Sequence, residues 1–302
     1  MALINPMNNI KPLYDAIKQH TKQYDSGDTD YSVTTLQDPP RIVQLERRHG
    51  HKVPFTVEGS LASFMGTAIH EYMEKMLIAG YPDIYKLEER LGRTVLNRKT
   101  TGAYDIFMTA ENELFDIKTS KTYNYLYNDR KHWTAQQNMY RSFIREKHGI
   151  KLKKLNIIFW GWEWSKYTMM QNKGYPRQQV VLINLPLWSD TRVHDYMEER
   201  VQMMIDSESL SDVDLPLCSR EDMWADDDVF AVHHRDKKKA LRLQPSYDTA
   251  KDWMNNYQQE SQIPISKLYV DTRPGKRKRC EDWCGINNYC NQYTDYCSMK
   301  GK

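Results

Sequence analysis

The sequence predicts an α/β protein in which a mixed central sheet is flanked by helices and a cysteine-stapled extension follows at the C-terminus. Three observations favour this fold. Apolar runs of strand length occur at 102–119, 155–164 and 178–185. Apolar residues recur at helical spacing at 61–76 and 188–207. Four of the five cysteines gather close to the C-terminus, beyond these strands and helices.

The segment 102–119 combines two carboxylates with a lysine. Apolar residues flank Asp105 and Asp116, and Asn112 lies where a hairpin would turn. Such a hairpin brings both acids to the same end of a sheet, and Lys118 points to the same face as Asp116. Two close oxygen ligands suit Mg²⁺ or Mn²⁺. A metal with a neighbouring ammonium suits phosphodiester hydrolysis.

The segment upstream of this hairpin reads as an amphipathic helix. His70 and Glu74 lie one turn apart beside its apolar stripe. A histidine in this position commonly packs at a helix–sheet boundary, and it can also reach a metal. The stripe is formed by Leu61, Met65, Ile69, Tyr72 and Met76.

Downstream of the hairpin, Trp133, Gln136, Tyr140 and Phe143 share one face of a predicted helix. Taken alone, this pattern indicates a core position for Tyr140 and a surface position for Gln136. Its importance comes from its place after the acids and the lysine.

In their order along the chain, these motifs resemble the PD-(D/E)XK nuclease superfamily, in the branch of RecB-type and CRISPR-associated exonucleases. Tyr104-Asp105 stands where that family has its proline–aspartate pair, and Asp116-Ile117-Lys118 matches the second half of the signature. His70 with Gly66 is similar to the GxxxH helix, and Gln136 with Tyr140 to the QxxxY helix of that branch. The resemblance covers roughly residues 31–165.

The resemblance implies a role for each matching residue. Asp105, Asp116 and Lys118 would be catalytic, and Gln136 with Tyr140 would position the DNA strand and the lysine. The metal, Mg²⁺ or Mn²⁺, would be held by His70, Asp105, Asp116 and Ile117.

The segment Asp38–His49 resembles the helical segment that leads into the core of the same exonucleases. In several of them a cysteine here is the first ligand of an iron–sulfur cluster. This chain has no cysteine in the segment, so that assignment does not transfer unchanged.

The cysteines instead stand at positions suited to a metal or cluster site near the C-terminus. We expect Cys218, Cys280, Cys284 and Cys290 to be ligands, with Cys297 in place of Cys218 as the main alternative. Thiolates at this spacing hold either a [4Fe-4S] cluster or structural zinc, and the sequence does not separate the two. Disulfides are disfavoured because the chain reads as intracellular. The surroundings of Cys218 and Cys280 resemble phage-encoded members of the superfamily.

Composition agrees with a cytoplasmic nucleic-acid enzyme, one that could be phage-encoded in a bacterial host. The chain has 302 residues and a net charge of only +3, and no apolar run reaches membrane-spanning length. Its basic residues cluster at 41–52, 237–239 and 273–279, where they could contact phosphates or form solvated faces. We expect residues 270–279 to form a basic linker into the cysteine segment.

We therefore expect a nuclease core at 1–210 and a C-terminal extension with the cysteine cluster at 211–302. The expected activity is metal-dependent hydrolysis of DNA, more exonucleolytic than site-specific, in replication, recombination or repair. DNA ends are the expected substrate, and a helicase, recombinase or single-strand-binding protein is a candidate partner. The alternatives are a nucleic-acid-binding scaffold with a decayed nuclease core, and a zinc-stapled protein that binds nucleic acid through its basic C-terminal segment.

Overall fold

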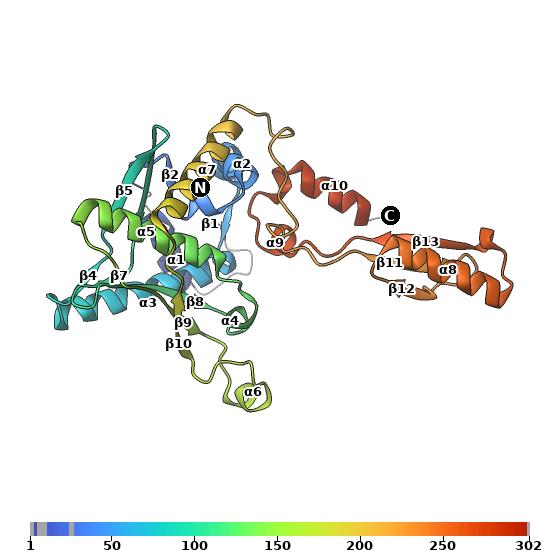
Figure 1. Ribbon diagram of the computed structural model, residues 1–302, viewed down its shortest axis with the longest axis horizontal. Helices are drawn as coiled ribbons and strands as arrows, with labels where there is room; N and C mark the ends of the chain where they lie inside the picture. Colours follow the sequence, from blue (N-terminus) through green and yellow to red (C-terminus); the bar gives the residue numbers. More distant parts are fainter. Residues whose placement is uncertain (1–2, 5–10, 24–26, 301–302) are drawn as a thin grey trace. The chain divides into compact units, whose positions relative to one another are not determined.

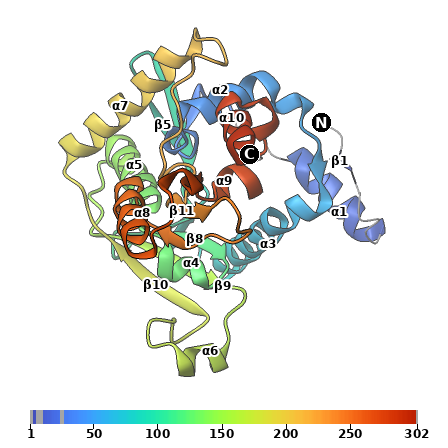
Figure 2. The ribbon, with the colours of Figure 1, turned by 90° about the vertical axis from the view of Figure 1, so that its right-hand side faces the viewer.

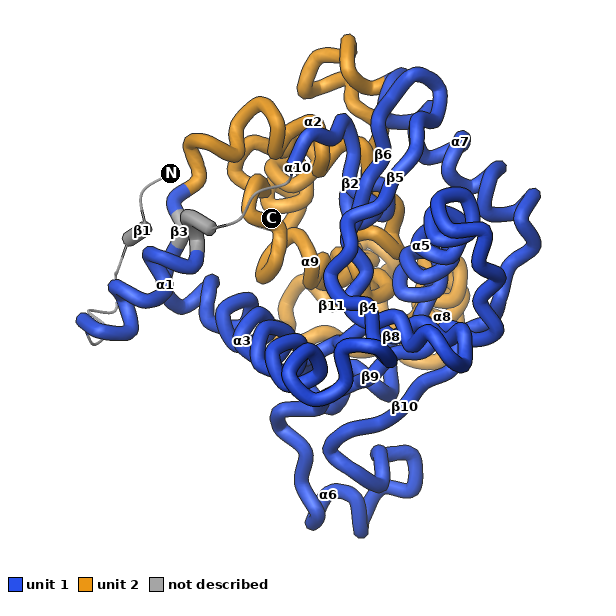
Figure 3. Tube along the Cα trace, turned by 90° about the vertical axis from the view of Figure 1, so that its left-hand side faces the viewer, with its two compact units in different colours: residues 1–38, 54–206 blue, residues 39–53, 207–302 orange. Residues whose placement is uncertain are grey.

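The computed structural model describes residues 3–4, 11–23 and 27–300. The chain forms two compact units, and each unit is built from two separate segments of the sequence. Unit 1 comprises Met1–Asp38 and Pro54–Asp206, and unit 2 comprises Pro39–Val53 and Ser207–Lys302 (Figure 3). The segment 39–53 therefore belongs with the C-terminal part of the chain. The predicted domain division at residue 210 stays a prediction.

Unit 1 is built on a five-stranded sheet with the order β10-β9-β8-β7-β4 (Figure 1). Strands β8 and β9 are parallel and the other neighbours are antiparallel, so the predicted mixed sheet flanked by helices is confirmed. The run of β-branched and aromatic residues in β9 suits a strand that is buried on both faces. The strands are β4 (Tyr85–Leu87), β7 (Ile106–Met108), β8 (Glu113–Ser120), β9 (Lys154–Gly161) and β10 (Val180–Leu185).

A second, three-stranded sheet of unit 1 has the order β2-β6-β5. Its strands are β2 (Tyr31–Ser32), β5 (Arg90–Val95) and β6 (Arg98–Ala103), with β6 parallel to β2 and antiparallel to β5. A short parallel pair joins β1 (Leu3–Ile4) to β3 (Phe55–Thr56).

Two long helices of unit 1 pack against the central strand β8. They are α3 (Val57–Gly80) and α5 (Lys131–His148), and α5 also contacts β9 and β5. Thr56 caps the start of α3, and Gly149 ends α5 in the left-handed conformation at φ 70°. Figure 2 shows α6 at the tip of the connection between β9 and β10. The remaining helical segments are α1 (Lys11–Gln23), η1 (Thr35–Gln37), α4 (Tyr123–Tyr127), α6 (Lys166–Gln171) and α7 (Asp190–Glu208).

The core of unit 1 lies between the central sheet and α5. The contributing side chains, all nearly inaccessible to solvent, are Leu114, Met139, Phe143, Ile144, Leu155, Ile157 and Phe159. The apolar stripe predicted for α3 is not part of this core. Met65, Tyr72 and Met76 are exposed, and only Val57 and Ser60 of α3 are buried. The helix and its periodicity were predictable, whereas the face that it buries was not.

Unit 2 has a small core between α2 (Pro40–His49) and the cysteine-bearing segments. Ile42 and Leu45 of α2 pack with Leu215 and Ile286. Around this core lie η2 (Gly50–Lys52), α9 (Lys278–Asp282), η4 (Asn287–Tyr289) and α10 (Asn291–Lys300).

The rest of unit 2 contains a three-stranded antiparallel sheet with the order β12-β11-β13 and a helix, α8 (Tyr247–Ser261), that packs on it (Figure 1). Ser246 and Thr249 form a reciprocal cap at the start of α8. The expectation of a basic linker at 270–279 is wrong for its first half. Those residues belong to β13, because their backbone pairs with β11. The strands and the turn between them are β11 (Val229–His234), β12 (Arg242–Gln244), η3 (Ile265–Lys267) and β13 (Leu268–Arg273).

Candidate active site

The β7–β8 hairpin places the two predicted acids opposite each other. Ile106 pairs with Phe115, so Asp105, one residue before β7, falls beside Asp116 on β8. Asn112 adopts the left-handed conformation at φ 57° and makes the turn. The backbone N–H of Ile117 donates to Asp105 Oδ2 at 2.7 Å and fixes that carboxylate. The predicted hairpin is confirmed.

Helix α3 brings His70 to this hairpin. A Cβ at Gly66 would lie 3.2 Å from Thr119 Oγ1, so the glycine permits a close approach between helix and strand. His70 Nδ1 lies 3.4 Å from Asp105 Oδ2, and Nε2 lies 3.0 Å from the carbonyl oxygen of Ile117. Because a carbonyl oxygen only accepts, Nε2 carries the proton of that contact and Nδ1 faces the acids.

Glu88 joins this group, although its position in the sequence carries no motif. Its Oε1 lies 4.0 Å from His70 Nδ1, and its backbone N–H donates to the carbonyl of Asp105 at 3.1 Å. Glu88 has a φ of 49°, a left-handed conformation that a glutamate adopts at some cost. Within the part of the chain that the structure describes, His70, Glu88 and Asp105 form the group of metal-ligating type whose ligand atoms lie within 4.8 Å of one another.

Asp116 and Lys118 form an ion pair on β8. The side chain of Asp116 is 1% exposed and that of Lys118 is 28% exposed, and Lys118 Nζ lies 2.8 Å from Asp116 Oδ2. Apart from this ion pair, the buried Asp116 Oδ2 has no hydrogen-bond partner. A buried carboxylate oxygen in that state fits a ligand position.

The charges of the site shift several pKa values. Burial, and then the charge of Asp116, raise the pKa of Asp105 to about 7. Burial lowers the pKa of Lys118, but Asp116 and Asp105 outweigh it and hold the pKa above its ordinary value, so the ammonium keeps its charge. For His70, burial likewise lowers the pKa, but the nearby carboxylates of Glu88, Asp105 and Asp116 raise it overall.

Helix α5 places Gln136 and Tyr140 as the sequence indicated. Gln136 Nε2 donates to the hydroxyl of Tyr140 at 3.3 Å. Tyr140 is 3% exposed, and burial raises the pKa of its phenol, so it stays protonated. A Cβ at Gly102 would lie 2.7 Å from the Tyr140 ring, so only glycine allows this ring to approach β6 so closely.

The donor set fits a hard divalent cation. Carboxylate oxygens and one imidazole suit Mn²⁺ or Mg²⁺. Ile117 has no side-chain donor, so its assignment to the metal concerns its carbonyl oxygen, which lies beside His70. Oxygen and nitrogen donors are thus offered by His70, Glu88 and Asp105 and by the buried Oδ2 of Asp116.

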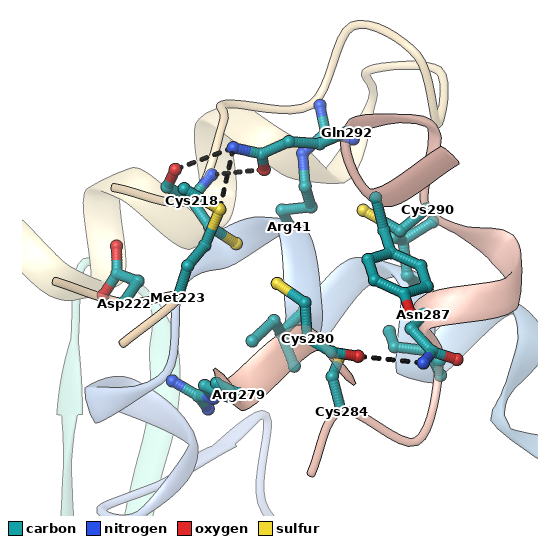
Figure 4. A pocket seen from close by; sticks show the side chains of 14 residues that line it. Arg41, Cys218, Asp222, Met223, Arg279, Cys280, Cys284, Asn287, Cys290 and Gln292 are labelled. Carbon is teal, nitrogen blue, oxygen red and sulfur yellow. Dashed lines mark hydrogen bonds between the residues drawn. The ribbon is translucent and has the colours of Figure 1, made fainter. Parts of the chain in front are cut away.

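The four cysteines favoured by the sequence line one pocket of unit 2 (Figure 4). All five cysteines are free thiols, and Cys297 is exposed and does not line this pocket. Burial raises the pKa of Cys218 to about 12 and that of Cys280 to about 11. These sulfurs are therefore protonated without a metal, and a bound metal or cluster would have to displace the protons.

Among the described cysteines, no three sulfurs lie within 4.8 Å of one another, whereas Zn–S bonds of about 2.3 Å in a tetrahedral site place the sulfurs roughly 3.8 Å apart.

Arg41 of α2 brings a buried positive charge to this pocket. The residue is 0% exposed and lines the pocket together with Arg279 (Figure 4). Its guanidinium donates to the carbonyls of Leu215, Pro216 and Asp212 and to the side-chain oxygen of Asn291, all uncharged. Helix α2, which carries Arg41, thus packs against the cysteine-bearing segments.

Of the three basic segments, the first serves mainly to build unit 2. Arg48 and His49 both contact Asp212, at 2.7 and 2.6 Å, and the ring of His49 stacks on Tyr289. The run at 237–239 lies exposed in the β11–β12 turn. In the third segment, Lys276 and Lys278 pair with Asp282 and Asp226. A search of the described helices finds none long and apolar enough to cross a membrane.

No family model and no curated protein matches the chain. Among solved structures, a protein designated SSO0001 aligns with a TM-score of 0.44 at 16% identity, over 63% of this chain and 84% of that one. A protein from Eubacterium rectale with the provisional name of exonuclease aligns with a TM-score of 0.42 at 13% identity, over 63% and 87%. A phage-related exonuclease from Haemophilus somnus 129PT aligns with a TM-score of 0.25 at 12% identity, over 64% and 77%.

Proposed function

We propose that this chain is a divalent-metal-dependent deoxyribonuclease that acts on DNA ends in replication, recombination or repair. The observation that carries the proposal is the convergence of His70, Glu88 and Asp105 beside the ion pair of Asp116 and Lys118. Three ligating groups alone occur in many surface sites. A lysine held charged against a fully buried carboxylate is costly to build, and phosphodiester hydrolysis uses both groups.

The residues divide the task by their positions. Mg²⁺ or Mn²⁺ would be held by His70, Glu88, Asp105, Asp116 and the carbonyl of Ile117. A metal bound there would polarise the phosphate and activate a water molecule. The ammonium of Lys118 would stabilise negative charge that develops on the phosphate. On α5, Gln136 and Tyr140 would orient the strand, because their hydrogen bond presents one amide and one phenol together.

The proposal is tested by cleavage of end-labelled linear DNA and of covalently closed circular DNA, with and without Mn²⁺. We expect the linear DNA to be degraded only when the metal is present, and the circle to be spared because it has no ends. Equal attack on both substrates would indicate an endonuclease. DNA binding without any cleavage under these conditions would favour the scaffold alternative.

Glu88 gives a further test, since it was found only from the structure. We expect Glu88→Gln to need several-fold more Mn²⁺ for half-maximal cleavage, because the amide keeps the shape but loses the charge that attracts the cation. Titration of cleavage rate against Mn²⁺ measures the effect. Glu71→Gln is the matched control, because Glu71 is an exposed glutamate adjacent to His70 on α3. The same response in both variants would remove Glu88 from the site.

For the cysteine pocket we propose a [4Fe-4S] cluster held by Cys218, Cys280, Cys284 and Cys290. The buried charge of Arg41 in the wall of the pocket supports this, because a cluster with four thiolates is anionic. A cluster there would join the segment around Cys218 to the C-terminal segment, and its binding would contribute to folding.

We expect Cys218→Ser to lower the melting temperature and to remove the brown colour of anaerobically purified protein. Cys297→Ser is the matched control and should change neither property, since Cys297 is exposed and outside the pocket. Iron, zinc and sulfide analysis identifies the bound group. A colourless protein with one zinc per chain would identify the bound group as zinc instead of a cluster. The absence of both iron and zinc would leave four partly buried thiols.

A further inference from the structure

The two faces of the three-stranded sheet in unit 2 differ in character. Helix α8 covers one of them, where the ring of Phe230 meets that of Tyr247 at 6.1 Å and Val232 and Leu268 are buried. Because successive strand residues alternate between faces, the pairing register assigns a different set to the opposite face. We call this second face the open sheet face, defined by Ala231, His233, Arg235, Leu243, Tyr269, Asp271 and Arg273.

Aromatic rings and guanidinium groups gather on the open sheet face. The rings of His233 and Tyr269 are stacked with centroids 5.2 Å apart and an interplanar angle of 12°. Arg235 lies over the Tyr269 ring at 5.5 Å, and Arg273 Nη2 donates to His233 Nε2 at 3.1 Å. Tyr269 is 40% exposed and Leu243 is 53% exposed, whereas Ala231 and His233 on β11 are buried, so the solvent-accessible part of this face lies on the two outer strands.

The helix and the sheet in this part of unit 2 differ in charge. Helix α8 carries one lysine and three acids: Lys251, Asp248, Asp252 and Glu260. The strands and turns carry two acids, Asp236 and Asp271, against seven basic residues: Arg235, Lys237, Lys238, Lys239, Arg242, Lys267 and Arg273. Arg242 shares the face of Val232, whereas Arg235 and Arg273 stand with Asp271 on the open sheet face, and the exposed lysines 237–239 lie in the adjoining turn. The open sheet face and this turn together carry an excess of positive charge that suits a polyanion.

We propose that the open sheet face binds single-stranded DNA. Unpaired bases stack on aromatic rings and on guanidinium planes, and a nearby basic run contacts the phosphates. A duplex offers phosphates but hides the faces of its bases, so it cannot use Tyr269 and Arg235 in this way. The choice of DNA among single-stranded nucleic acids rests on the proposed nuclease function. The stacking and the charge do not depend on it.

The test uses the full-length protein and a labelled single strand of about 16 nucleotides. Binding is measured by fluorescence anisotropy in chelator, so that no cleavage occurs. We expect Tyr269→Ala to weaken single-strand binding by at least about fivefold, the loss that removal of one stacking ring produces. Tyr269→Phe keeps the ring and should bind like the wild type. Duplex binding should be the same for all three proteins.

A second set of variants separates charge from stacking. The variant with Lys237→Glu, Lys238→Glu and Lys239→Glu should bind more weakly and show a shallower dependence of affinity on salt, because fewer counterions are released. Tyr269→Ala should keep the wild-type salt dependence. Lys251→Glu on α8 is the matched control and should change neither property. Circular dichroism and the melting temperature show whether each variant is folded.

Three results would overturn the proposal. The first is wild-type affinity for the single strand in folded Tyr269→Ala and in the lysine variant. The second is an equal loss on single strand and duplex, which would reduce the face to a general phosphate contact. The third is clearly tighter binding of single-stranded RNA. Because binding is measured in chelator and cleavage with Mn²⁺, a wild-type protein that binds the single strand but cleaves no DNA would overturn the nuclease assignment and leave this proposal standing.

Discussion

Replacement of Asp116 by alanine should abolish DNA cleavage, with a loss of at least about a thousandfold, since a metal ion and its ligands contribute several kcal/mol to the transition state. The reason lies in the surroundings of the carboxylate. Its Oδ2 is buried, has no hydrogen-bond partner and lies next to the Lys118 ammonium. Water cannot replace such a ligand without giving up the position of the metal.

Asp116→Asn accompanies this variant because the loss of a buried anion could unfold the hairpin and leave Lys118 without its partner. The amide keeps the volume and removes the charge. Both variants are compared with Asp195→Asn, an exposed aspartate on α7. Cleavage rates and melting temperatures are measured at ordinary Mg²⁺ concentration. A folded Asp116→Asn protein that cleaves DNA at nearly the wild-type rate would contradict the assignment of the site.

Replacement of Lys118 by alanine should reduce turnover about a hundredfold or more while DNA affinity changes little. A preorganised charge of this kind acts on negative charge that appears in the transition state, not on the phosphate of bound DNA. The two neighbouring acids keep the pKa of Lys118 above its ordinary value, so the group remains an ammonium through neutral pH.

Single-turnover rates at saturating DNA, together with affinities measured in chelator, separate the two quantities. Lys118→Arg keeps a positive charge but carries it on a larger, planar group, so we expect only partial recovery. If Lys118→Ala loses affinity and turnover by the same factor, the lysine is a phosphate contact and has no special role in the transition state.

Local signals explain which parts of the fold were predictable. The hairpin at Asp105 and Asp116 was predictable because Asn112 tolerates the left-handed conformation that its turn requires. The strand at 154–161 was predictable from an unbroken apolar run. The buried side of α3 was not, because periodicity marks an apolar face without naming what covers it. Strand β13 was missed because its basic residues read as a linker, and pairing with β11 decided otherwise.

Some residues of the candidate site were likewise predictable from the sequence, and others were not. His70, Asp105, Asp116, Lys118, Gln136 and Tyr140 stand in motifs with fixed spacing, and the structure brings the first four together at one end of the sheet. Glu88 stands in no motif. Its only signal is an acidic residue at the break between two strands, and the distance to His70 depends on how β4 pairs with β7. Arg41 was assigned to a basic surface segment, but its burial follows from contacts more than 170 residues away.

The place of α2 in unit 2 has a consequence for the order of events on the ribosome. Ile42 and Leu45 are synthesised early, but their partners Leu215 and Ile286 emerge some 170 and 240 residues later. At about 5–20 residues per second, this helix spends roughly ten seconds to most of a minute without the core that it will join. During that interval its apolar side and the Arg41 guanidinium can contact only solvent or a chaperone. A chain released after residue 206 would retain α2 permanently in that state, so removal of the C-terminal part should yield a protein that aggregates unless residues 39–53 are replaced by a polar loop.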